Sequence, residues 1–85
     1  MDKAPCSVSF FWHRILRCLE DRLGGVTVAA WLDQTEAVSL VDNKLILKET
    51  AKFRREIITR RLVAIMQEIA KEEFGFDIEV VLREA

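Results

Sequence analysis

The sequence predicts an α+β domain in which two long helices and one short helix cover a three-stranded sheet. Three observations predict this class. Two segments carry apolar residues at three-to-four spacing, two alternating segments flank the pair Asp42-Asn43, and a further alternating segment lies near the end of the chain. The expected order of elements is therefore α-α-β-β-α-β.

Length and composition indicate one globular domain. The chain has 85 residues, of which 51% are hydrophobic and 32% charged. Its formal charge of -1 argues against strong whole-surface attraction to nucleic acid or anionic membrane. We expect residues 1–8 to form a flexible extension and residues 9–85 to form a single interaction domain.

The same features predict a cytoplasmic protein. The start, MDKAPCSVSFFW, lacks the apolar segment and cleavage site of a secretory signal, and no apolar run reaches the ~18 residues of a membrane span. Cys6 and Cys18 match neither a disulfide framework nor a metal site.

The first long helix is predicted to begin at Ser9, a plausible N-cap, and to stop at Gly24. Its apolar stripe comprises Phe11, Trp12, Ile15, Leu16, Leu19 and Leu23. The next stretch, GGVTVAAWLDQ, is ambiguous because its β-branched residues favour a strand. A short helix is preferred, since Val28, Trp31 and Leu32 then fall at positions i, i+3 and i+4.

A hairpin follows. Segments around Val38–Leu40 and Lys44–Lys48 alternate, and Asp42 and Asn43 tolerate the positive φ of a tight turn. Thr50 is a plausible cap for the second long helix, which is expected to end at Gly75. Phe76, Ile78, Val80 and Leu82 then alternate with residues of the opposite face as a half-buried final strand.

Catalysis is not indicated, and no cofactor or metal is expected. His13 lies on the polar face of its helix without a spaced carboxylate or nucleophile, and Cys18 fits a small core residue. Gly24-Gly25 lacks the further glycines and lysine of a phosphate loop.

One charge cluster opens the second long helix: Lys52, Arg54, Arg55, Arg60 and Arg61. The favoured interpretation is a solvated face whose arginines pair with Glu49, Glu56 and nearby acids. Weak contact with single-stranded DNA is the alternative, although the strands lack the rings of RNA-binding sheets.

Two aromatic positions are candidate interface anchors. Phe10, Phe11 and Trp12 are consecutive, so at least one of these rings must face outward from a helix. Phe53 opens the second long helix between Lys52 and Arg54. Core-edge packing is the structural alternative for both.

The order FWHRILRCLEDRL, VAAWL, VDNKLILKE and AKFRREIITRRL resembles the N-terminal domain (domain I) of the bacterial chromosomal replication initiator, DnaA. The resemblance covers about residues 9 to 83. It implies a K-homology-like fold and a non-catalytic domain of a longer initiator. That domain mediates self-association and contacts the replicative helicase and initiation regulators, with weak single-stranded DNA contact.

The resemblance also implies roles for particular residues. Trp12, beside Phe11, matches the tryptophan linked to self-association, and Phe53 matches the aromatic linked to helicase contact. Thr27 stands where some members carry an acid that serves the helicase, and ETA replaces APN before Phe53. Two alternatives are a K-homology-like single-stranded nucleic-acid module, although no G-x-x-G loop is present, and an unrelated interaction domain.

Overall fold

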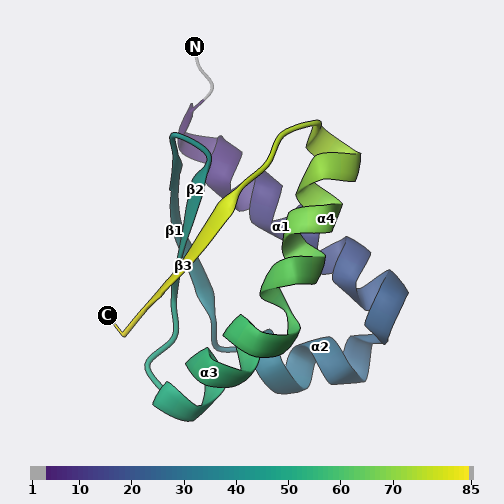
Figure 1. Cartoon of the computed structure of the whole chain (residues 1–85), viewed down its shortest axis with the longest axis vertical. Helices are drawn as coiled ribbons and strands as arrows, with labels where there is room; N and C mark the ends of the chain where they lie inside the picture. The colour runs from purple at the N-terminus through teal and green to yellow at the C-terminus, as the bar shows by residue number, and fades with distance from the viewer. Residues whose placement is uncertain (1–3, 85) are drawn as a thin grey trace.

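The computed structural model describes residues 4–84, with side chains from residue 8 onward (Figure 1). The described chain forms an α+β domain, as predicted, with helices packed on a three-stranded mixed sheet. The elements are α1 (Ala4–Leu23), α2 (Gly25–Leu32), β1 (Glu36–Val41), β2 (Lys44–Lys48), α3 (Lys52–Arg61), α4 (Val63–Phe74) and β3 (Glu79–Arg83).

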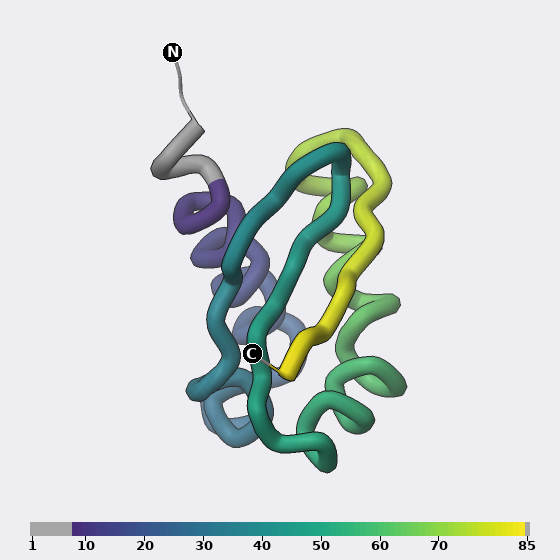
Figure 2. Tube along the Cα trace, turned by 90° about the vertical axis from the view of Figure 1, so that its left-hand side faces the viewer, coloured from purple at the N-terminus to yellow at the C-terminus, as the bar shows by residue number. Residues whose placement is uncertain are grey.

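The sheet has the order β1-β2-β3. β1 pairs antiparallel with β2, while β3 pairs parallel with β2 because α3 and α4 carry the chain back along the sheet. Figure 2 shows the helices on one face, with β3 at one edge. On the covered face Leu45 and Leu47 are fully buried. The other face, which carries Ile46, is open.

The hairpin turn is confirmed. Asp42 and Asn43 have φ of 54° and 61°, and Val41 pairs with Lys44 across them. These are the two positive-φ positions that a two-residue hairpin loop requires. The alternation in β1 is interrupted, because the register shifts between Ala37 and Ser39 and leaves Val38 53% exposed.

The first long helix begins earlier than predicted. α1 starts at Ala4, so Ser9 lies within it and is not its N-cap. The proposed extension 1–8 is therefore helical from Ala4 on, while residues 1–3 lie outside the described residues. Pro5 lies in the first turn of this helix, where proline is tolerated because its missing N–H would have no partner within the helix. At the other end Gly24 takes a φ of 91°, as a stop there requires.

The short helix is confirmed as α2, with Val28 and Leu32 buried against the core and Trp31 half-buried. The second long helix, in contrast, is two helices that bend at Leu62. Hydrogen bonds continue through the bend, from Leu62 N to Ile58 O and from Met66 N to Leu62 O, both 2.9 Å. The bend lets α3 pack on α2 while α4 packs on α1.

The predicted helix cap and strand start are also displaced. Ala51, not Thr50, is the N-cap of α3, and it makes no side-chain capping bond. β3 begins at Glu79, after Phe76. The Phe76 ring instead stacks on Phe11, with centroids 5.9 Å apart, because the chain is still turning out of α4 at Gly75 (φ 82°).

Within the described residues, none of the helices combines the length and apolar character needed to cross a membrane.

Candidate functional site

Phe53 is the exposed aromatic of the α2–α3 side of the domain. It lies in the first turn of α3 and is 66% exposed. Its ring centroid lies 6.3 Å from that of half-buried Trp31 on α2, with the planes tilted by 51°. The core therefore holds one ring of the pair and leaves the other in solvent, an arrangement typical of an interface anchor.

A shallow hollow continues from this pair. It encloses about 330 Å³ between the end of α1, α2 and the bend of α3–α4. Its lining residues are Leu23, Thr27, Trp31, Arg61, Leu62 and Ile65. Trp31 thus belongs both to the hollow and to the ring pair with Phe53. We call Thr27, Trp31, Phe53 and this hollow the α2–α3 surface.

Polar groups surround the surface. Arg54 Nη1 lies 3.4 Å from Asp33 Oδ1, which joins α3 to the end of α2 beside the ring pair. Arg61 adds a cation to the hollow. An apolar centre with a charged margin is the general anatomy of a protein interface.

A buried carboxylate fixes the start of α3. Glu49 is only 2% exposed, and its Oε1 accepts a 2.8 Å hydrogen bond from Thr35 Oγ1. Its Oε2 accepts from Ala51 N at 3.1 Å. Arg55 Nη1 donates to the carbonyls of Glu49 (2.7 Å) and Thr50 (3.1 Å). These bonds hold the segment from which Phe53 projects.

The role of Glu49 differs from the expected one. The sequence predicts a solvated partner of arginine side chains, whereas Glu49 is buried and Arg55 bonds its backbone carbonyl. A weak signal exists: Glu49 follows β2 at the position where the alternation of Leu45 and Leu47 puts the next inward residue, so a charged residue falls on the apolar face.

The first-helix aromatics are placed differently from the prediction. Phe11 is 3% and Trp12 is 7% exposed, so both belong to the core. The outward ring required by three consecutive aromatics is Phe10, which is 65% exposed. It meets Phe74 edge-on at a centroid distance of 6.5 Å. Trp12 is therefore not a surface anchor, because α1 turns its ring into the core.

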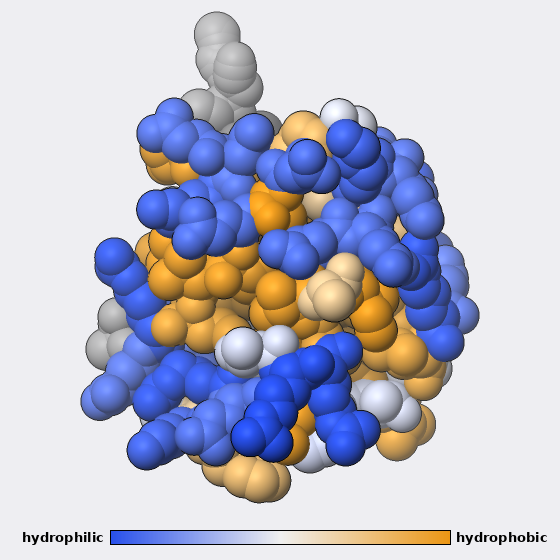
Figure 3. All heavy atoms as spheres, in the orientation of Figure 1, coloured by the Kyte–Doolittle hydropathy of each residue, from blue (hydrophilic) through white to orange (hydrophobic). Residues whose placement is uncertain are grey.

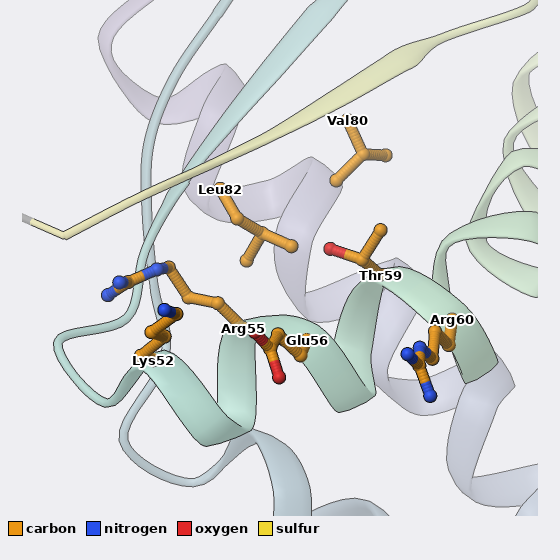
Figure 4. Close-up of a pocket in the computed structure, with 7 residues that line it drawn as sticks. All are labelled: Lys52, Arg55, Glu56, Thr59, Arg60, Val80 and Leu82. Carbon is orange, nitrogen blue, oxygen red and sulfur yellow. The ribbon is translucent and has the colours of Figure 1, made fainter.

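The basic cluster does not share one face. Lys52, Arg55 and Arg60 line an open groove of about 440 Å³ between α3 and β3, together with Glu56, Thr59, Val80 and Leu82 (Figure 4). Arg54 and Arg61 lie on the side of the α2–α3 surface. These cations are close together in the sequence. Successive residues of a helix point in different directions, however, so the side chains are distributed around α3.

The described residues contain no group of three or more His, Cys, Asp or Glu side chains that could hold a metal ion. His13 is exposed, as predicted. Cys18 packs half-buried against the core, and burial raises the pKa of its thiol, which makes it a poor nucleophile at neutral pH. Its neighbours Arg14 and Arg22 are tied to α4 through Glu73, Glu68 and Glu72.

No model of a known protein family matches the chain.

Proposed function

We propose that this chain is a non-catalytic interaction domain of a bacterial DNA replication initiator, similar to domain I of DnaA. In this proposal the α2–α3 surface contacts the replicative helicase and initiation regulators. The first helix contributes a separate, weak self-association contact.

The observation that carries the proposal is the Phe53–Trp31 pair. An exposed phenylalanine normally costs little to replace by a polar residue, and yet this one is held over a tryptophan beside an apolar hollow. Phe53 and Thr27 are the two residues that the resemblance links to helicase contact, and Trp31 lies between them on the α2–α3 surface. Residues from separate helices thus converge on one patch.

Phe10 supports the self-association part. Its 65% exposed ring lies beside Phe74, in the N-terminal half of α1. A contact centred on one ring is small, so we expect dissociation constants near or above micromolar.

The distribution of cations favours an interaction domain over the alternative K-homology-like nucleic-acid module. A backbone-binding surface gathers its cations along one track, whereas Arg54 and Arg61 lie away from Lys52 and Arg55. Any single-stranded DNA contact is therefore expected to be feeble and to disappear at physiological salt.

The proposal is tested by titrating the isotopically labelled domain with the helicase of the same organism and following backbone amide resonances. We expect changes centred on Thr27, Trp31 and Phe53, with the hairpin around Asp42 as an internal reference that stays unchanged. Binding elsewhere, or no binding, contradicts the proposal.

A further inference from the structure

Within residues 4–84, no strand pairs with the outer edge of β3. Glu79 N donates to Asn43 O at 2.9 Å, and Arg83 O accepts from Glu49 N at 2.8 Å. In a parallel ladder every second residue bonds to the same neighbour, so Glu79, Val81 and Arg83 face β2. Val80 and Leu82 consequently turn their N–H and C=O groups away from the sheet.

A side chain of the protein hydrogen-bonds the backbone of this edge at one point. Gln67 Nε2 of α4 donates to Ile78 O at 3.0 Å, just before β3 begins. Beyond Ile78, among the described residues, the backbone bonds outside helices and strands include none from Val80 or Leu82. An exposed edge of this kind is a template for one more strand.

The open edge borders the groove between α3 and β3. Figure 4 shows the Val80 and Leu82 side chains directed into this groove toward Thr59, with Lys52 and Arg55 at its end near the C-terminus. Figure 3 shows apolar surface in the middle of the same face, bounded by hydrophilic side chains. The groove therefore offers an apolar floor, a polar wall and free backbone groups.

The charges that line the groove indicate what kind of ligand it binds. The groove lining contains three cations and one acid: Lys52, Arg55, Arg60 and Glu56. The chain already places a carboxylate at its end, since Glu84 Oε1 lies 3.9 Å from Arg55 Nη2. The position therefore accepts a carboxylate, and an acidic segment complements it.

We propose that this groove binds an extended acidic peptide segment of a partner protein, which adds to the sheet as a strand beside β3. Val80 and Leu82 supply the backbone hydrogen bonds, and Lys52 and Arg55 pair with its carboxylates. The groove lining contains no aromatic ring on which a base would stack, and this favours a peptide over single-stranded DNA.

A second copy of the domain fits less well than a lone segment. Figure 2 shows α3 and α4 extending past the edge of β3 on the helical face. Antiparallel pairing of two β3 strands would put the helices of both copies on the same face, where they meet. A single extended strand avoids that conflict.

The test uses an acetylated peptide of about seven residues that alternates valine and glutamate. Two N-methylated versions carry the methyl groups on alternate amides, one set for each edge of the extended peptide. We expect the parent peptide to shift the amide resonances of Val80 and Leu82 and to slow their hydrogen exchange. One methylated version should lose binding and the other should keep it, because only one edge can meet β3.

Protein variants make the test independent of that peptide chemistry. Lys52→Glu should weaken binding by about fivefold or more, whereas Arg61→Glu, the same charge change away from the groove, should have no effect. Phe53→Ala should also leave peptide binding unchanged, so this site and the α2–α3 surface succeed or fail separately.

Three outcomes would overturn the proposal. They are no saturable binding of the parent peptide, equal behaviour of the two methylated peptides, and preferential binding of an oligodeoxythymidine in the groove. Tighter binding of a matched valine–lysine peptide would refute the charge argument in the same way.

Discussion

Replacing Glu49 by alanine tests how the start of α3 is held. The substitution removes the acceptor of both Thr35 Oγ1 and Ala51 N. Ala51 is exposed, so water can take over its N–H at little cost. Thr35 is only 6% exposed, and its stranded hydroxyl should cost about 1–3 kcal/mol. We therefore expect the free energy of unfolding to fall by about that amount.

Urea unfolding measures the loss, and Thr35→Val provides the matched partner. If the hydrogen bond between the two side chains is responsible, the double variant should be less destabilised than the sum of the single ones. The amide resonances of Phe53 should shift in Glu49→Ala, since the segment before α3 loosens. A change in stability below about 0.5 kcal/mol, the range of ordinary surface substitutions, would refute this reasoning.

Two further predictions concern the first helix. Phe10→Ala should weaken self-association with little loss of stability, whereas Trp12→Ala should cost about 3–5 kcal/mol of stability because that ring is buried. Sedimentation across a concentration series and urea unfolding separate the two, and a strictly monomeric wild type would contradict the first. In a Cys6→Ser variant, Cys18 should react with iodoacetamide at pH 8 more slowly when folded than in urea, because burial raises the pKa of its thiol. The unfolded thiol ionises at lower pH than the folded one. The contribution of the buried thiol to stability is therefore complete below the ordinary thiol pKa and decreases as pH rises above that value. Equal reaction rates in the folded and the unfolded protein would contradict the raised pKa.

The α+β class could be predicted because the side-chain period differs between helices and strands and survives in the sequence. Two further features could be predicted because each requires a positive φ, which few residue types adopt. They are the turn at Asp42-Asn43 and the helix end at Gly24. The choice of a helix for α2 followed from the position of Leu32 relative to Val28.

The bend at Leu62 could not be predicted. The segment around it contains neither proline nor glycine, and Ile58, Leu62 and Met66 keep their period across the bend. The direction change comes from tertiary packing, because α3 must contact α2 and β3 while α4 follows α1. The helix propensity of the residues does not reflect that packing requirement, so it does not predict the bend.

The candidate site was predicted in part. Phe53 was identified from its position and is exposed in the structure, whereas the outward ring of the first helix proved to be Phe10 instead of Trp12. Three consecutive aromatic residues on a helix require that one ring face outward, but the sequence does not determine which of the three it is. The open edge of β3 was not foreseen, since strand order cannot be read from a single sequence.

The central claim is that Phe53 is an anchor for a partner and not a support of the fold. Phe53→Ala should weaken the complex with the helicase by about 1–3 kcal/mol, measured by calorimetric titration. Val41→Ala, an exposed apolar residue at the hairpin end, should leave that affinity unchanged. Unfolding in urea should show a loss of no more than about 0.5–1.5 kcal/mol, the value of the ring contact with Trp31. Unchanged helicase affinity in Phe53→Ala, or a stability loss of the about 3–5 kcal/mol typical of a buried phenylalanine, would contradict the account.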